Sequence, residues 1–424
     1  MGHVIDDGLQ STPEAAEPVE EQPLPLLEPR DGVPEVVRTP EALAATVAAF
    51  TAGSGPVAID AERASGYRYG QRAYLVQLRR AGAGTALIDP VECPDLSGLS
   101  VALDGVEWVL HAASQDLPCL DEVGMRPSAL FDTELAGRLG GYPRVGLGPL
   151  VAAVLGLALE KGHGAADWST RPLPEPWLRY AALDVEVLVE LRDSLEAVLR
   201  DQGKLDWALE EFAAIAAAPP GPPRVDPWRR LSGLHRVRGR RALAAAQALW
   251  EARDELARKR DLAPGRVLPD TAIVAAVTAA PRSVQELGKI PPFNGQRTRR
   301  HVPYFWAALE RAAAVPDDQL PAVSLGGDAP PPARAWSERD PAAAERLAAA
   351  RPAVAAIADE HGVPVENLLA PDAVRRLCWT PPDDLSAESV AEVLRGHGAR
   401  AWQVTLTAGV LSRALQRAQR KAEA

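Results

Sequence analysis

Two proline-rich stretches divide the 424-residue chain and limit what each part can fold into. Residues 219–223 read Pro-Pro-Gly-Pro-Pro, and residues 315–334 include three consecutive prolines at 330–332. Proline removes a backbone donor and fixes φ, so neither a helix interior nor a central strand can run through such a stretch. The chain is therefore expected to fold as separate units joined by stiff connectors.

The part of the chain before the first connector alternates short apolar runs with helical stretches. The apolar runs lie at residues 57–59, 74–78, 86–88, 108–110 and 130–131. A succession of strands and helices of this kind indicates an α/β domain, which we assign to residues 40–218. Its last long helix is expected from about Pro176 to Val198.

The two parts after the first connector show helical spacing only. We expect an all-helical domain at residues 226–313, a Pro/Gly-rich linker at 314–335 and a second helical domain at 336–420. Residues 262–270 and 363–372 resemble each other, and each segment follows one long helix and precedes another. Two copies of one small helical module are the simpler account of this repeat.

The first 39 residues differ in composition from the rest of the chain. They hold nine acidic and two basic residues, with scattered prolines and few bulky apolar side chains. Such a segment buries too little apolar surface to offset the entropy lost on ordering. We expect residues 1–39 to form a disordered acidic tail.

A pair of carboxylates ends the apolar run at 57–59. Asp60 and Glu62 are two residues apart, and alternate residues of a strand point to the same side of the sheet. Two like charges held so close are costly unless a cation lies between them. Taken alone, however, the pair could be a solvated strand end.

Two further carboxylates and a tyrosine follow along the chain. Asp116 comes just after the run at 108–110, where a strand passes into a helix. At that position its negative charge could simply interact favourably with the helix dipole. Tyr180 and Asp184 are four residues apart within the expected helix and therefore share one face.

The order and separation of these five residues resemble those of the DEDD exonucleases of the tyrosine subtype, the ribonuclease D family. The runs that carry the resemblance, over about residues 40–215, are Val57-Ala58-Ile59-Asp60-Ala61-Glu62, Leu87-Ile88-Asp89-Pro90, Leu110-His111-Ala112, Phe131-Asp132-Thr133, Asp167-Trp168 and Tyr180-Ala181-Ala182-Leu183-Asp184. Residues 226–313 resemble the helicase-and-RNase-D C-terminal (HRDC) module, and the final region resembles a second, more divergent one. The resemblance implies an RNase H-like α/β domain with a mixed β-sheet, followed by two small all-α HRDC-type domains.

The resemblance also implies a metal-dependent 3′→5′ exoribonuclease that releases nucleoside 5′-monophosphates. Its cofactors would be two divalent cations, Mg²⁺ or Mn²⁺, which prefer the oxygen ligands that carboxylates supply. Asp60, Glu62 and Asp184 would hold the ion that activates water, and Asp60 would share the second ion with Asp116. Tyr180 would orient the attacking water. The expected substrate is structured RNA with a free 3′ end, such as a tRNA precursor, in tRNA 3′-end maturation or RNA processing.

Two other functions fit the same residues. One is a 3′→5′ DNA exonuclease of the same family, and the other is an inactive nucleic-acid-binding scaffold. The presence of all five chemical positions argues against the scaffold. Two neighbouring residues are left out of the predicted site: His111 is expected to pack or hydrogen-bond beside it, and Asp132 is expected to be a separate structural acid.

The charge is unevenly distributed along the chain. The net charge of −11 suggests no polyanionic partner, but residues 226–313 hold 17 basic and 8 acidic residues, a net charge of +9. We expect this segment to hold the phosphate backbone of RNA. The arginines nearest its start are the candidate contacts, although such a cluster can also be a solvated face: Arg236, Arg238, Arg240 and Arg241.

The cysteines and the apolar runs bear on location. Cys93, Cys119 and Cys378 lie far apart, with neither disulfide-framework nor zinc-ribbon spacing, which fits a reducing compartment. The longest apolar run, residues 146–159, is too short to span a bilayer, and no secretory signal is visible. We expect a cytoplasmic protein with no membrane partner, and a monomer.

Overall fold

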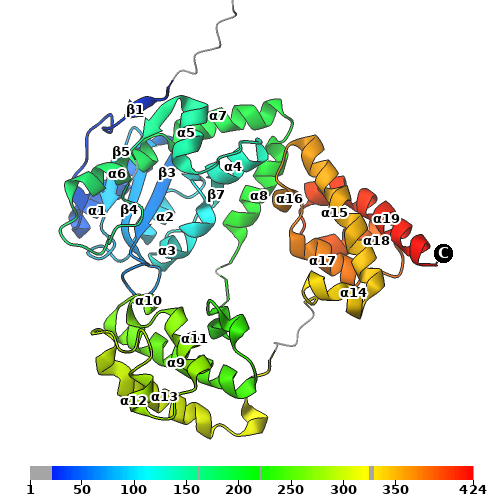
Figure 1. Ribbon diagram of the computed structural model, residues 1–424. Coiled ribbons are helices and arrows are strands. Elements are labelled where there is room, and N and C mark those ends of the chain that lie inside the picture. The colour runs from blue at the N-terminus through cyan, green and yellow to red at the C-terminus, as the bar shows by residue number, and fades with distance from the viewer. Residues whose placement is uncertain (1–21, 161, 220, 223, 324–328, 424) are drawn as a thin grey trace, which may run out of the picture.

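The computed structural model describes residues 22–160, 162–219, 221–222, 224–323 and 329–423. Figure 1 shows an α/β body formed by the first half of the chain and two separate helical bodies, one in green to yellow and one in orange to red. Residues 1–21 of the predicted acidic tail lie outside the described residues.

A six-stranded mixed sheet forms the centre of the α/β body. In spatial order its strands are β2 (Val36–Val37), β5 (Gly84–Ile88), β4 (Ala73–Ala81), β3 (Ser54–Arg63), β6 (Glu107–Leu110) and β7 (Ala129–Asp132). Strand β3 is antiparallel to β4 and parallel to β6, so the sheet is mixed, as predicted. Val57, Ala58 and Ile59 are fully buried, which explains why this run is apolar without alternation.

The expectation of disorder is wrong for residues 22–39. Strand β2 pairs with β5, and β1 (Leu24–Leu26) pairs with β8 (Leu157–Leu159) in a second, two-stranded sheet. Arg30 donates to both carboxylate oxygens of Glu190, at 2.5 and 2.9 Å, and Arg79 reaches Asp31 at 2.9 Å. Backbone pairing and ion pairs therefore hold this polar segment, although it buries little apolar surface itself.

Helices cover the sheet and connect its strands. They are α1 (Pro40–Ala52), α2 (Ser97–Ala102), α3 (Leu117–Glu122), α4 (Thr133–Leu139), α5 (Leu147–Leu155), α6 (Glu175–Glu186), α7 (Leu188–Asp201) and α8 (Leu205–Ala217). The helix expected from about Pro176 to Val198 is two helices, because the chain breaks at Val187. Helix α6 packs on β3, β4 and β5, whereas α7 packs on β3 and β6. The break thus lets one continuous segment follow two parts of a twisted sheet.

The first helical module has its own core. Its helices are α9 (Arg240–Arg260), α10 (Pro264–Val267), α11 (Asp270–Ala279), α12 (Val284–Leu287) and α13 (Val302–Ala314), preceded by the 3₁₀ turns η2 (Pro227–Arg230) and η3 (Leu234–Arg236). Helix α13 packs along α9, and Trp228, Phe293 and Phe305 are buried between the elements.

The final helical module begins after the linker. It contains α14 (Trp336–Arg339), α15 (Pro341–His361), α16 (Val365–Leu368), α17 (Pro371–Trp379), α18 (Ala387–Gly396) and α19 (Ala401–Glu423). Helices α15, α16 and α17 have 21, 4 and 9 residues, against 21, 4 and 10 residues in α9, α10 and α11. Helices α15 to α17, which follow α14, therefore repeat the succession of α9 to α11.

The final module docks on helix α8 of the α/β body. Trp207 of α8 stacks on Trp402 of α19, with ring centroids 4.9 Å apart and planes at 10°. Glu210 accepts hydrogen bonds from the backbone N–H groups of Ala401 and Trp402 and so caps the start of α19. Among the described residues, no helix combines the length and apolar composition needed to span a membrane.

Candidate functional site: a carboxylate cluster at the sheet

Strand β3 carries Asp60 and Glu62 to the site. The strand pairs Asp60 with Gln77 and Glu62 with Leu75, and the Gln77 side-chain amide donates to Asp60 Oδ2 at 3.0 Å. The ladder is irregular between Glu62 and Arg63, where the strand leaves regular pairing. Bulges of this kind are common beside active sites, because they change the direction of a side chain.

Helix α6 brings Asp184 against the two strand carboxylates. One carboxylate oxygen from each of Asp60, Glu62 and Asp184 lies within 4.8 Å of the other two. Tyr180, one turn earlier on α6, lies against Asp184, and the two side chains interact electrostatically. The structure thus gathers four of the five predicted chemical residues from two elements that lie more than 100 residues apart in the sequence.

Asp116 approaches the cluster from a tight turn after β6. The chain enters the left-handed region at Ala112 (φ 59°), forms the 3₁₀ turn η1 (Ala113–Gln115) and places Asp116 immediately before α3. Its carboxylate is buried and lies 3.2 Å from the guanidinium of Arg63. Asp116 is not one of the three residues whose oxygens meet within 4.8 Å, but its charge interacts with that of Asp60.

The protonation of these acids reflects burial first and mutual repulsion second. Burial and the neighbouring carboxylates raise the pKa of Glu62 and of Asp184 well above the ordinary values, and burial raises that of Asp60. Burial, followed by the charge of Asp60, raises the pKa of Asp116 to about 8. Charging all four together is therefore unfavourable unless positive charge is supplied.

The donor set suits hard divalent cations. All the candidate ligand atoms are carboxylate oxygens, which Mg²⁺ and Mn²⁺ prefer, and the three that meet can contact one ion together. Asp60 retains some exposure to solvent, which leaves the cluster open to an ion and a substrate. Arg63 supplies one positive charge at the edge, where its guanidinium forms an ion pair with Asp116.

Asp132, which the sequence excluded from the ligands, has a structural role. It accepts hydrogen bonds from the backbone N–H groups of Ala112 and Ala113, at 3.1 and 2.8 Å, and from two N–H groups at the start of α4. It therefore holds the left-handed turn that leads to Asp116. His111 lies 2.9 Å from the hydroxyl of Thr133, and burial lowers its pKa to about 4, so it is uncharged at neutral pH.

Sequence reasoning missed the pairing of Asp89 with Arg171. Asp89 begins the turn after β5, and its fully buried carboxylate oxygens also accept from Arg171 at 2.7 and 2.8 Å. Arg171 also donates to the carbonyls of Tyr74 and Trp168, and so ties the loop before α6 to the sheet. The partners are 82 residues apart, and the sequence offers no signal that joins them.

The four arginines predicted to bind RNA fall into two groups. Arg240 donates to the carbonyls of Leu320 and Pro321, and Arg241 bonds to carbonyls at the end of α13 and to Asp317. These two guanidinium groups hold the linker against the first helical module. Arg236 and Arg238 are exposed, and Arg238 donates only locally to the carbonyl of His235 at 2.7 Å.

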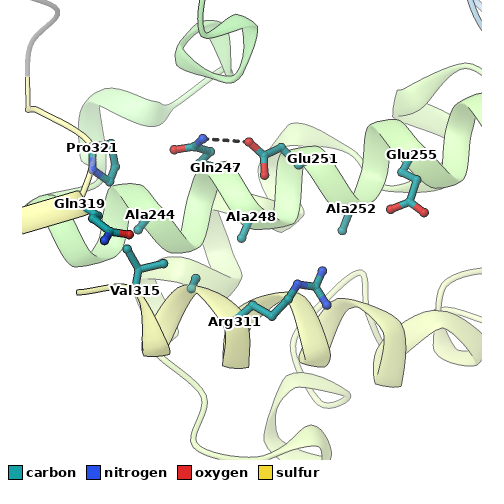
Figure 2. A pocket seen from close by; sticks show the side chains of 11 residues that line it. Ala244, Gln247, Ala248, Glu251, Ala252, Glu255, Arg311, Val315, Gln319 and Pro321 are labelled. Atoms are coloured by element: carbon teal, nitrogen blue, oxygen red, sulfur yellow. Dashed lines mark hydrogen bonds between the residues drawn. The ribbon is translucent and has the colours of Figure 1, made fainter. Parts of the chain in front are cut away.

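A hollow of about 340 Å³ lies between α9 and α13 (Figure 2). Its lining residues are distant in the sequence from the carboxylate cluster. Gln247 and Glu251 of α9 are hydrogen-bonded at 2.8 Å, Glu255 follows further along the helix, and Arg311 of α13 lies across from them. Two glutamates on its lining repel phosphate, so we assign no nucleic-acid contact to it.

The fold and the cluster define a class of protein, a 3′→5′ exonuclease. Residues 34–200 match the family described as 3′-5′ exonuclease, and residues 242–309 match the HRDC domain. Residues 329–415 match the 3′ to 5′ exonuclease C-terminal domain rather than a second HRDC domain.

Individual relatives narrow the class to one family. Ribonuclease D of Gluconacetobacter diazotrophicus is 32% identical over 339 residues, which are 78% of this chain and 82% of that protein. Among solved structures, a protein from Bifidobacterium adolescentis has a TM-score of 0.80 at 39% identity and covers 93% of this chain and 100% of its own. RNase D of Escherichia coli, described as an exoribonuclease involved in structured RNA processing, has a TM-score of 0.66 at 27% identity over 90% of this chain and 98% of its own. The chain belongs to the ribonuclease D family.

Proposed function

We propose that this protein is a 3′→5′ exoribonuclease that removes nucleoside 5′-monophosphates one at a time from structured RNA, such as tRNA precursors. The observation that carries the proposal is the meeting of Asp60, Glu62 and Asp184 within 4.8 Å, with Tyr180 interacting with Asp184 from one turn earlier on α6. The RNA substrate is supported by the family and by the structured-RNA processing ascribed to the Escherichia coli relative.

Two divalent cations, Mg²⁺ or Mn²⁺, are the proposed cofactors. Asp60, Glu62 and Asp184 would hold one, and Asp60 and Asp116 the other. When bound, such ions supply positive charge that acidifies water and stabilises the leaving 3′ oxygen. The raised pKa of Asp116 and its three neighbours supports this proposal, because the cluster as it stands lacks the positive charge needed to keep all four ionised.

Tyr180 is proposed to orient the attacking water rather than to remove its proton. Burial, together with the charges of Asp184 and Glu62, raises the pKa of Tyr180 far above its ordinary value, so the phenol stays protonated. A neutral hydroxyl can donate to Asp184 and accept from water at the same time. Arg63, beside Asp116, is placed to meet a phosphate once the carboxylates are neutralised.

Hydrolysis with matched variants tests the proposed function. Wild-type protein with Mg²⁺ or Mn²⁺ should shorten a labelled RNA from its 3′ end and release mononucleotides. Asp60→Asn should lose more activity than the roughly 10–100-fold typical of removing a group that only orients a metal ligand, and Tyr180→Phe should lose about 100-fold in kcat. No release from wild type with either ion would reject the proposal, and activity retained by Asp60→Asn would reject this site.

Comparing RNA and DNA substrates distinguishes the exoribonuclease from the alternative, a DNA exonuclease. RNA and DNA strands of one sequence differ along the backbone in the 2′-hydroxyl, which a protein can read. We expect kcat/KM to favour RNA. A higher kcat/KM on the DNA strand would favour the DNA exonuclease over the exoribonuclease.

We also propose that the final module is a second, divergent HRDC-type module. The support is the shared succession of a 21-residue helix, a 4-residue helix and a helix of 9 or 10 residues. The protein is proposed to act as a monomer in the cytoplasm, where its three free, buried cysteines would stay reduced.

A further inference from the structure

The first helical module contacts the exonuclease body through the loop that leaves the catalytic strand. Residues 64–72 connect β3 to β4 and begin two residues after Glu62. Tyr69 of this loop packs against the core of the helical module, and its hydroxyl lies 3.1 Å from both oxygens of Asp254 on α9. Its backbone N–H donates to Asp261 at 3.2 Å. Figure 1 shows the loop reaching down to the helical body beside α10.

A second set of contacts lies nearer to the carboxylates. Arg266 of α10 donates to the carbonyl of Gly66 at 2.7 Å, and its guanidinium carbon lies 4.1 Å from the centre of the Tyr67 ring. The backbone N–H of Ala263 donates to the carbonyl of Tyr67 at 3.0 Å. The helical module therefore fixes both the backbone and the ring at residues 66 and 67.

Tyr67 also lines a pocket that includes Glu62 of the carboxylate cluster. The pocket has a volume of about 280 Å³ and is lined by Glu62, Arg63, Tyr67 and Ala165 among others. The hydroxyl of Tyr67 donates to the carbonyl of Ala165 at 3.3 Å, which joins the two walls of the pocket. His163 directly precedes the second wall in the sequence and lies edge-on to Tyr180, with ring centroids 5.7 Å apart.

We propose that the first helical module completes the active site, with Arg266 as a positioning residue. Acting through Gly66 and Tyr67, Arg266 sets the wall of the pocket beside Glu62, and this pocket receives the nucleoside at the 3′ end of the RNA. The proposal rests on the proposed exoribonuclease function. It assigns the module a task beyond holding the phosphate backbone with its positive charge.

A substrate too short to span the module separates these two tasks. If the module only tethers RNA, changing Arg266 weakens the cleavage of long RNA and leaves the dinucleotide pUpU unaffected. If Arg266 shapes the pocket, the cleavage of pUpU itself suffers, because a displaced pocket wall binds the nucleoside less well and can cost up to about 100-fold in kcat/KM. The loss should fall mainly on KM, whereas Tyr180→Phe should lose kcat.

The experiment measures kcat and KM for pUpU with full-length protein and Mn²⁺. Arg266→Ala should lower kcat/KM by about 10-fold to 100-fold, and Arg266→Lys should recover part of it, since lysine keeps the charge but not the planar fork. Tyr67→Phe, which loses only the bond to Ala165, should lose about 3-fold. The matched control is Arg282→Ala, an exposed arginine of the same module just before α12, which should equal wild type.

The outcomes are distinct. Arg266→Ala with wild-type kcat/KM on pUpU overturns the proposal, and a loss confined to long RNA assigns Arg266 to tethering instead. If Arg266→Ala lowers the melting temperature, its loss of activity could reflect instability. Tyr67→Phe then provides the test, because its ring still packs under Arg266 and only the hydrogen bond across the pocket is removed. Wild type inactive on both pUpU and long RNA would reject the proposed function rather than this inference.

Discussion

For individual residues, electrostatics dominates, because four carboxylic acids meet in one largely buried cluster. Asp60, Glu62, Asp116 and Asp184 all have a raised pKa, chiefly because burial disfavours the charged form. Burial raises the pKa of Asp132 as well, although the four backbone hydrogen bonds that it accepts favour its ionised form. The same residue type therefore serves two purposes: Asp132 fixes a turn, and the cluster is built to gain positive charge from outside.

The cluster predicts how stability depends on pH without metal. A folded pKa above the unfolded value of ~4 means that the folded protein keeps protons that the unfolded chain has released. The free energy of unfolding should thus fall as pH rises from ~4 towards the folded value of about 8 for Asp116, by ~1.4 kcal/mol per pH unit for each proton retained. Mn²⁺ favours the charged form and should raise the melting temperature more at pH 8 than at pH 6.

Differential scanning calorimetry with EDTA or with Mn²⁺ at both pH values measures this effect. Asp60→Asn removes a shared ligand and should reduce the Mn²⁺-dependent gain at pH 8. An equal gain at pH 6 and pH 8 would show that Mn²⁺ binds outside the cluster.

At the scale of elements, sequence patterns predicted which carboxylates of β3 and α6 would come together, but not the elements that support them. Asp60 and Glu62 could be paired because a strand alternates its faces, and Tyr180 and Asp184 because a helix turns every 3.6 residues. The break at Val187 separates α6, which packs on β3, β4 and β5, from α7, which packs on β3 and β6, and no glycine or proline marks it in the sequence. Strand β2 is two residues long and is defined only by its partner β5, so local composition suggested disorder instead.

The contact between α8 and α19 yields a prediction at this scale. Trp402 is nearly buried and stacks on Trp207, so Trp402→Ala should lower the free energy of unfolding by about 3 kcal/mol. Trp402→Phe keeps an aromatic ring at the interface and should lose much less. Urea unfolding followed by circular dichroism at 222 nm measures both variants. Equal losses in the two variants would show that the stacked ring does not stabilise the docked module.

At the scale of the whole molecule, charge and chemistry lie in different modules. Residues 41–225 hold 15 basic and 25 acidic residues, whereas residues 226–313 carry the net charge of +9. The sequence located this asymmetry but not the use of each arginine, because hydrogen bonds from Arg240 and Arg241 to the linker depend on tertiary structure. Arg236 and Arg238 are left exposed to solvent on the same module.

The salt dependence of RNA binding should therefore distinguish these arginines. Binding of a single-stranded RNA is measured in the Asp60→Asn background, so that the RNA stays intact. The Arg236→Ala, Arg238→Ala double variant should weaken binding and reduce the slope of log K against log salt by about 1.4, at ~0.7 for each phosphate that the protein no longer neutralises. Arg240→Ala should leave the slope nearly unchanged, since its guanidinium is bonded to the carbonyls of Leu320 and Pro321.

A matched control separates local phosphate binding from net charge. Arg395→Ala removes an exposed arginine of the final module, and therefore changes the net charge of the protein without touching the basic module. Its slope should equal that of the background protein. If Arg395→Ala reduces the slope as much per arginine as the double variant does, long-range attraction rather than direct phosphate binding by Arg236 and Arg238 accounts for the affinity. In that case the positive module steers RNA towards the acidic body without holding it.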